Sequence, residues 1–222
     1  MRIAFFDLDR TLFSVNSGAL WLRREFVAGH ISFRQAARAG VWLTRYQLGL
    51  ADLELAIVQA VATLAGTDSR PVKARIEQFY RDELKGCYRP RALEVLERHR
   101  RANDRCVLLT ASTEYLSRLV VEELSLDGYL CNRLELDDRG FHTGRVLGGA
   151  CFGRGKLRHA EGYVKDLGAT LSDCTFYTDS YSDRSVLYEV GKPVAVNPDV
   201  RLYRLARKQG WETVDWGVPG GS

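Results

Sequence analysis

The sequence predicts an α/β protein in which a doubly wound parallel sheet carries an all-helical cap inserted after the first strand. From residue 89 onward, short apolar runs alternate with segments of helical periodicity, as they do in parallel sheets connected by helices. Between about residues 17 and 85, apolar residues recur only at helical spacing, and runs of β-branched residues are absent. Short crossovers between parallel strands are right-handed, so helices are expected on both faces of the sheet.

The expected elements follow in chain order. Residues 2–7 form an apolar run that ends at acidic residues, which predicts a buried first strand. A turn sequence, Asp137-Asp138-Arg139-Gly140, separates apolar stretches at 134–136 and 141–146 and indicates a β-hairpin. Helices are expected at 18–28, 32–48, 51–64, 70–85, 91–102, 114–123, 156–167, 182–190 and 199–209, and further strands at 105–110, 129–133, 175–178 and 193–196.

This order divides the chain into three parts. Residues 1–14 and 88–216 are expected to form the sheet core, residues 15–87 the helical cap, and residues 217–222 a flexible tail. Open α/β sheets bind ligands at the carboxyl ends of their strands. The cap is therefore expected to lie over that edge of the sheet.

The bulk properties exclude several classes of protein. A net charge of +4 is far below the concentrated positive charge of a nucleic-acid binder. The five cysteines are scattered and include no Cys-x-x-Cys pair, which argues against a disulfide framework and a structural zinc site. The sequence shows no signal-peptide core and no apolar segment long enough to span a membrane. We expect a cytoplasmic protein without stable membrane association, and the oligomeric state stays open.

Four polar clusters follow strand-like runs or open a helix. Because the carboxyl ends of parallel strands share one edge of the sheet, all four are expected to converge there. The clusters are Asp7 with Asp9, Thr110-Ala111-Ser112, Lys156 after Gly153-Arg154-Gly155, and Asp179 with Asp183.

The residue types in these clusters suit phosphoryl transfer. Carboxylates brought together repel one another and stay ionised only beside a compensating cation. Hard oxygen ligands favour Mg²⁺ over zinc. The Thr110 hydroxyl, the backbone amides after it and the Lys156 ammonium are suitable donors to phosphoryl oxygens. Thr110 is preferred to Ser112 as the phosphate-binding hydroxyl because it ends the strand, although either residue could serve.

With these clusters in order, the sequence resembles the haloacid dehalogenase (HAD) superfamily, in particular its phosphoserine-phosphatase-like subfamily IB. The resemblance extends from Arg2 to about Trp211, although the cap matches only in position and helical character. It implies a Rossmann-like core and a helical cap. The matching motifs are Asp7-Leu8-Asp9-Arg10-Thr11, Leu109-Thr110-Ala111-Ser112, Gly155-Lys156 and Thr178-Asp179-Ser180-Tyr181-Ser182-Asp183.

The resemblance implies catalytic roles for the carboxylates. Asp7 would be the nucleophile that forms an aspartyl-phosphate, and Asp9 the general acid and base. Mg²⁺ would be held by the Asp7 carboxylate, the Asp9 backbone carbonyl and Asp179. Asp183 would lie outside the ligand set and orient Lys156 or a metal-bound water. Ser182 stands where the motif often has Asn, so one polar contact is expected to be weaker.

The phosphate-binding residues follow from the same resemblance. Thr110 and Lys156 would hold the phosphoryl group, with Ala111 and Ser112 beside them. Thr11 would stabilise the loop around the nucleophile at the phosphate site. The expected activity is Mg²⁺-dependent hydrolysis of a small-molecule phosphomonoester.

The substrate beyond the phosphate depends on the cap. Phosphoserine enzymes of this subfamily have an acidic residue shortly after the first motif, whereas residues 13–17 contain none and Glu25 is the first to follow. A histidinol-phosphate-like or other small metabolite phosphate is therefore favoured over phosphoserine. Arg34, Arg38 and Arg45 are expected either to form a solvated face or to meet an anionic group of the substrate.

Proteins with other functions combine similar residues. A phosphomutase or phosphotransferase on the same fold is left open. A signalling receiver domain also combines acidic residues, a Thr or Ser and a Lys, but its phosphorylated Asp belongs to a later strand and no cap interrupts it. Dehalogenases of this superfamily lack the second Asp of the first motif, so Asp9 favours phosphoryl chemistry.

Overall fold

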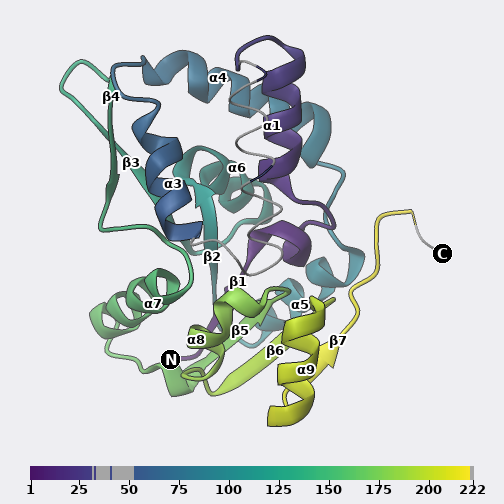
Figure 1. Ribbon diagram of the computed structural model, residues 1–222. Helices are drawn as coiled ribbons and strands as arrows, with labels where there is room; N and C mark the ends of the chain where they lie inside the picture. The colour runs from purple at the N-terminus through teal and green to yellow at the C-terminus, as the bar shows by residue number, and fades with distance from the viewer. Residues whose placement is uncertain (32, 34–40, 42–52, 221–222) are drawn as a thin grey trace.

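The computed structural model describes residues 1–31, 33, 41 and 53–220. These residues form one seven-stranded sheet in the order β4-β3-β2-β1-β5-β6-β7 (Figure 1). Neighbouring strands are parallel except for the antiparallel pair β3 and β4. The strands are β1 (Ile3–Phe6), β2 (Arg105–Thr113), β3 (Gly128–Leu136), β4 (His142–Leu147), β5 (Cys174–Thr178), β6 (Lys192–Val196) and β7 (Glu212–Val214).

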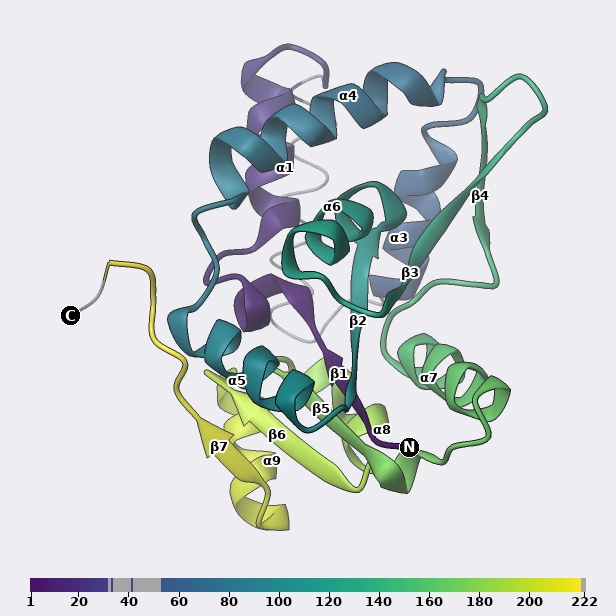
Figure 2. The same ribbon diagram turned by 180° about the vertical axis from the view of Figure 1, so that it is seen from behind.

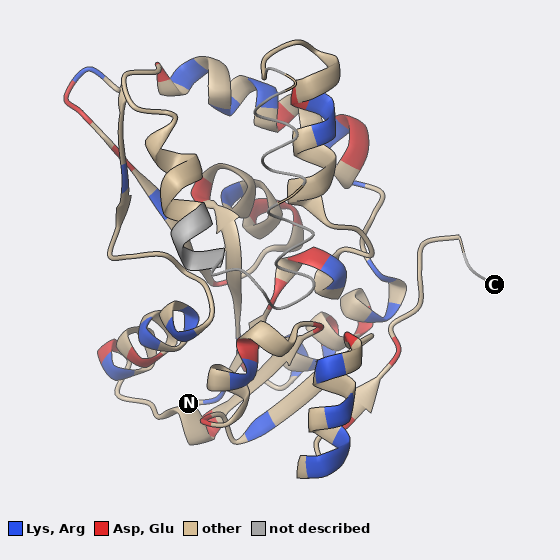
Figure 3. Ribbon diagram, in the orientation of Figure 1, with Lys and Arg blue, Asp and Glu red and all other residues tan. Residues whose placement is uncertain are grey.

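Helices cover both faces of this sheet, as Figures 1 and 2 show from opposite sides. Apolar side chains of α5 and α6 pack on one face, and those of α7, α8 and α9 pack on the other. Lys and Arg are distributed over several of these helices (Figure 3). The described helices are α1 (Ser17–Val27), α3 (Leu53–Ala62), α4 (Ser69–Phe79), α5 (Pro90–Arg101), α6 (Glu114–Leu124), α7 (Arg154–Asp166), α8 (Arg184–Leu187) and α9 (Val200–Gln209).

The central strand β1 shows why the sheet is doubly covered. Ala4 and Phe6 belong to the core on one face, and Ile3 and Phe5 belong to the core on the other. All four side chains are buried, so the strand is apolar throughout rather than alternating. This continuous run ends at Asp7 and therefore delivers a carboxylate to the carboxyl edge of the sheet.

Helices α1, α3 and α4, which we call the cap, lie beyond the carboxyl ends of the central strands (Figures 1 and 2). The chain leaves and re-enters the core side by side, where Phe13 and Tyr88 form an antiparallel bridge. The β3–β4 hairpin makes a third connection. The His142 backbone N–H donates to the Thr67 carbonyl at 2.9 Å, and Gly66 N–H donates to the His142 carbonyl at 2.8 Å.

The predicted fold class is confirmed, with differences in individual elements. The strand expected at 129–133 and the first hairpin arm at 134–136 are one strand, β3. Strand β7 was not expected, and the helix expected at 182–190 is shorter and begins with a helical turn at Tyr181–Asp183. The helix expected at 32–48 lies outside the described residues except for positions 33 and 41, and its three arginines are all outside them. No helix in the described part of the chain is long and apolar enough to cross a membrane.

Candidate active site

Asp7 stands at the carboxyl end of β1, where the backbone turns sharply. Its N–H donates to the Tyr177 carbonyl at 2.9 Å, so the residue is still held by β5. The chain then enters a tight turn in which Arg10 has a φ of 58°, in the left-handed region. The Asp9 carboxylate accepts a 2.7 Å hydrogen bond from the Ser17 backbone N–H. The nucleophile candidate is buried, and Asp9 points to the first residue of the cap.

Lys156 lies between two of the predicted carboxylates. Its Nζ donates to Asp7 Oδ1 at 2.9 Å and to Asp183 Oδ2 at 2.8 Å. All three side chains are buried. Gly155 makes this position possible, because a Cβ there would stand 1.9 Å from the Ala150 carbonyl oxygen. The start of α7 therefore approaches the backbone closely enough to bring Lys156 into the cluster.

The fourth motif joins this cluster from β5. The Thr178 hydroxyl donates to Asp183 Oδ2 at 2.7 Å, the oxygen that also accepts from Lys156. Asp179 N–H donates to Thr11 Oγ1 at 3.0 Å, which links the fourth motif to the first. The Ser182 hydroxyl contacts that of Ser180 at 2.8 Å and lies 3.5 Å from Asp183 Oδ1.

The second motif lies at the end of β2, the strand beside β1. Thr110 is buried, and its hydroxyl oxygen accepts a hydrogen bond from Ser112 N–H at 3.1 Å. The Ala111 carbonyl is held by Asn132 Nδ2 at 2.6 Å. The Oδ1 atom of the same Asn132 accepts from Cys151 N–H at 2.8 Å. Asn132 thus ties the second motif to the segment that leads into α7.

Two structurally important residues were not predicted from the sequence. Asn132 carried one weak signal, as the polar residue that directly follows the apolar run Tyr129-Leu130-Cys131. Arg89 is buried, and its Nε donates to the Arg10 carbonyl at 3.1 Å while its Nη1 donates to the Gly217 carbonyl. No local signal distinguishes Arg89 from a surface arginine before a helix.

The structure thus brings three of the predicted residues, Asp7, Lys156 and Asp183, into one group of direct contacts. Asp7, Lys156, Asp183 and Thr178 form one hydrogen-bonded chain. Thr110 and Ser112 lie on the neighbouring strand, where Leu108 is opposite Phe6, the residue before Asp7.

The cluster contains more acidic side chains than basic ones. Burial and the nearby Asp183 raise the pKa of Asp7 to about 7, although Lys156 opposes this. Burial, with Asp7 and Asp183, also raises the pKa of Asp179 well above its usual value. Burial alone would lower the pKa of Lys156, but Asp183 and Asp7 together raise it. Three carboxylates therefore share one ammonium, and the cluster carries a deficit of positive charge.

This deficit fits a divalent cation. The described residues include no group of three or more His, Cys, Asp or Glu side chains placed to hold a metal. A cation here would instead use two carboxylates, Asp7 and Asp179, together with backbone carbonyl oxygen and water. Oxygen ligands with several waters are the coordination that Mg²⁺ prefers. The donor set and the missing positive charge thus agree with Mg²⁺.

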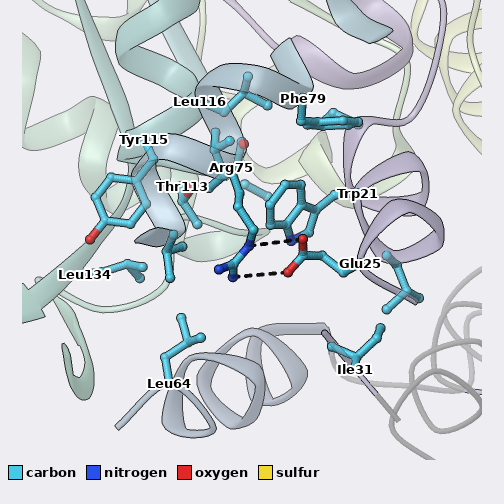
Figure 4. A pocket seen from close by; sticks show the side chains of 17 residues that line it. Trp21, Glu25, Ile31, Leu64, Arg75, Phe79, Thr113, Tyr115, Leu116 and Leu134 are labelled. Carbon is cyan, nitrogen blue, oxygen red and sulfur yellow. Dashed lines mark hydrogen bonds and ion pairs between the residues drawn. The ribbon is translucent and has the colours of Figure 1, made fainter. Parts of the chain in front are cut away.

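A cavity of about 340 Å³ lies between the cap and the core (Figure 4). Helices α1 and α4, the end of β2 and the start of α6 line it. Ser17 and Ser112 are among its lining residues, which connects the cavity to Asp9 and to the second motif. Its walls are mostly apolar, but the ion pair of Glu25 and Arg75 faces its interior (Figure 4).

Known proteins resemble this chain along its length. Phosphoserine phosphatase SerB1 of Mycobacterium tuberculosis is 31% identical over 220 residues, which cover 97% of this chain and 71% of that protein. Histidinol-phosphatase of Neisseria meningitidis serogroup C is 25% identical over 218 residues, which cover 96% of this chain and 98% of that protein.

A solved structure shows the same fold. A protein of unknown function from Bordetella pertussis Tohama I superposes with a TM-score of 0.86 at 29% identity. The match covers 97% of this chain and 98% of that one. In addition, the family model of haloacid dehalogenase-like hydrolases matches residues 4–187. The chain belongs to the haloacid dehalogenase-like hydrolase family.

Proposed function

We propose that this chain is a Mg²⁺-dependent phosphatase that hydrolyses a small-molecule phosphomonoester, with Asp7 as the nucleophile. The observation that carries the proposal is the buried chain of Asp7, Lys156 and Asp183 at the carboxyl edge of the sheet. Lys156 orients the Asp7 carboxylate and supplies positive charge beside it, as attack on a phosphate requires. Relatives named as phosphatases support the same reaction.

The reaction divides into two steps. In the first, an Asp7 carboxylate oxygen bonds to phosphorus, the ester P–O bond breaks, and Asp9 gives its proton to the leaving oxygen. In the second, a water attacks the aspartyl-phosphate and gives its proton to Asp9, which releases inorganic phosphate and restores Asp7. Burial raises the pKa of Asp9, which favours the protonated form needed in the first step.

The remaining site residues bind the phosphoryl group and the cation. Thr110 and Lys156 would hold phosphoryl oxygens, and the N–H groups near Ala111 and Ser112 would add backbone donors. Thr11 supports the loop through its hydrogen bond from Asp179 N–H. When bound, Mg²⁺ would neutralise charge that develops on the phosphoryl oxygens.

The residues that contact Lys156 from behind the site, and the division into core and cap, belong to the same proposal. Asp183 would orient Lys156, to which it is bonded, and Ser182 would support Asp183. We assign residues 1–14 and 88–216 to the core, 15–87 to the cap and 217–222 to the tail. The bridge between Phe13 and Tyr88 supports the boundary where the chain crosses between core and cap.

The leaving group is proposed to be histidinol-like or another small alcohol rather than serine. Between Phe13 and the start of α1, the chain offers no carboxylate that could bind the amine of serine beside the phosphate. Asn16, the residue before α1, accepts the Ala19 N–H and caps the helix instead.

Phosphate release from p-nitrophenyl phosphate, measured with Mg²⁺ and with EDTA, tests this function. Asp7→Asn keeps the shape of the side chain but removes the nucleophile, so activity should fall by at least about 1,000-fold. Asp138→Asn, at the exposed turn of the hairpin, is the matched control and should leave activity unchanged. Circular dichroism checks that both variants fold. Full activity of folded Asp7→Asn, or activity resistant to EDTA, would contradict the proposal.

A further inference from the structure

The cavity beneath the cap has a layered arrangement. Along α1, Gly18, Trp21, Leu22 and Glu25 follow helical spacing and line one wall. Along α4, residues at the same spacing line the facing wall and end at Phe79. The two helices contact each other at the cavity through Trp21 with Phe79 and through Glu25 with Arg75 (Figure 4).

The middle and far layers differ in chemistry. In the middle, the rings of Trp21 and Phe79 meet edge to face, with centroids 5.3 Å apart. One helical turn farther along α1 from Ser17 and Asp9, Arg75 Nε and Nη2 each lie 3.2 Å from a Glu25 carboxylate oxygen. Aromatic rings therefore line the middle of the cavity, and an ion pair without net charge lines its far end.

The ion pair of Glu25 and Arg75 retains hydrogen-bonding capacity. Its contacts of 3.2 Å are longer than the 2.7–2.9 Å typical of charge-assisted bonds. Among the described residues, Glu25 accepts from Arg75 and contacts His30 Nδ1 at 3.2 Å. Arg75 has five N–H groups, of which two face Glu25, and its side chain is 34% exposed. One further donor and one further acceptor can therefore be satisfied here.

An ion pair formed by the buried Glu25 and the partly exposed Arg75 adds little stability to an apolar wall. Replacing such a pair with apolar side chains of similar size is often neutral or stabilising. Glu25 is 6% exposed and Trp21 and Phe79 lie one turn away, so a wholly apolar wall would close this end more simply. The presence of the pair points to a ligand that contacts it.

Helix α1 gives the distance that such a ligand must span. Ser17, which contacts Asp9, and Glu25 are eight residues apart, or about 12 Å along the helix axis. Trp21 lies one turn from each of them, so a ligand that reaches from Asp9 to Glu25 must extend past its ring. The amine of serine is three bonds from its ester oxygen and reaches no farther than about 4 Å. Imidazole nitrogens of histidinol phosphate, about five or six bonds away, reach about 6 Å.

The geometry points to a specific substrate class, an inference that rests on the proposed phosphatase function. The leaving alcohol carries a planar ring that contacts Trp21 and Phe79. At its far end, beyond the reach of a serine amine, it carries both a hydrogen-bond donor for Glu25 and an acceptor for Arg75. Glu25 and Arg75 are thus specificity-determining residues, and they take no part in the phosphoryl chemistry.

Two substrates of matched size test this assignment. The imidazole of L-histidinol phosphate is a ring with both a donor and an acceptor, whereas 3-phenylpropyl phosphate has a phenyl ring on a chain of the same length and lacks both the ring nitrogens and the amine. The measured quantity is the ratio of their kcat/KM values, with p-nitrophenyl phosphate as the measure of the phosphoryl chemistry. Wild type should favour histidinol phosphate by at least about 10-fold, the effect of a hydrogen bond to a charged group.

The variants separate specificity from catalysis. Glu25→Gln should lower the ratio by about 10-fold, chiefly through KM, and Glu25→Met with Arg75→Met should bring it near unity. Glu83→Gln removes a carboxylate from another ion pair of the cap, with Arg24, and should leave the ratio unchanged. Hydrolysis of p-nitrophenyl phosphate should stay within about twofold in all three variants.

The remaining outcomes contradict either the role of Glu25 and Arg75 in specificity or the phosphatase function, and the two cases can be told apart. An unchanged ratio in the double variant, or equal losses for all three esters, would show that the ion pair is structural. If Glu25→Gln fails to fold, the double variant decides, because it leaves no unpaired charge. Absence of wild-type hydrolysis of every ester would instead refute the proposed phosphatase function.

Discussion

Substitution of Gly155 by Ala tests whether the position of Lys156 depends on the backbone of α7. A Cβ at Gly155 would stand 1.9 Å from the Ala150 carbonyl oxygen, whereas real Cβ contacts are essentially never shorter than 3.0 Å. The start of α7 must therefore move by at least 1.1 Å, the difference between these distances. Lys156 is the next residue and moves with it, away from Asp7 and Asp183.

The magnitude follows from this displacement. A misplacement of about 1 Å in a catalytic group costs about 100-fold in rate, so kcat/KM for p-nitrophenyl phosphate should fall by that factor. Overpacking of a buried site costs about 1–3 kcal/mol. In a chain of this size, that loss lowers Tm by roughly 2–12 °C.

Gly162 in the same helix supplies the matched control. No atom lies within 4 Å of a Cβ built there, so Gly162→Ala should keep full activity. This variant should also gain about 0.5–1 kcal/mol of stability, because alanine has a higher helix propensity than glycine in a helix interior. Thermal melts and steady-state rates of both variants make the comparison. Wild-type activity and Tm in Gly155→Ala, or equal losses in Gly162→Ala, would refute the reasoning.

Two other positions are expected to support the site indirectly. Asn132→Leu leaves the Ala111 carbonyl and the buried Cys151 N–H without their partner, so the free energy of unfolding in urea should fall by about 2–4 kcal/mol. A decrease below about 0.5 kcal/mol would show that neither contact matters. Arg89→Met releases the Arg10 carbonyl in the turn after Asp7, so kcat should fall about 10-fold with little change in KM. An unchanged kcat, measured in the folded variant, would exclude a positioning role for Arg89.

The central strands were predictable because burial on both faces leaves a continuous apolar run. Residues 3–6 form such a run, and Asp7 ends it, so both the strand and its polar end are visible in the sequence. Strand β7 has no comparable signal. Its three residues, Glu212–Val214, pair only with β6 at the edge of the sheet, and none of their side chains is buried. An edge strand this short does not produce a readable pattern.

The candidate site could be predicted where its residues belong to local motifs, and not where long-range contacts place them. Asp7, Lys156 and Asp183 belong to local motifs, whereas the role of Arg89 depends on a contact with Arg10, 79 residues away in sequence. The same holds for the cavity. Glu25 and Arg75 meet only because α1 and α4 pack against each other, and helical periodicity within each does not predict that pairing.

The contacts between the hairpin and the cap bear on how the cavity is formed. The buried His142 side chain of β4 contacts the Thr67 hydroxyl at 3.1 Å and the Tyr115 hydroxyl at 2.9 Å. Tyr115 lines the cavity, so one hydrogen-bonded chain joins the hairpin, the cap and the cavity wall. At Gly144, a Cβ would stand 3.0 Å from the Ala65 side chain, so β4 lies close against the cap. Because core and cap are joined here as well as at the crossover of the chain, we expect the cavity to change little when a substrate binds. A pre-formed cavity reduces the ordering that binding requires, and selectivity then depends on how well the leaving group fits it.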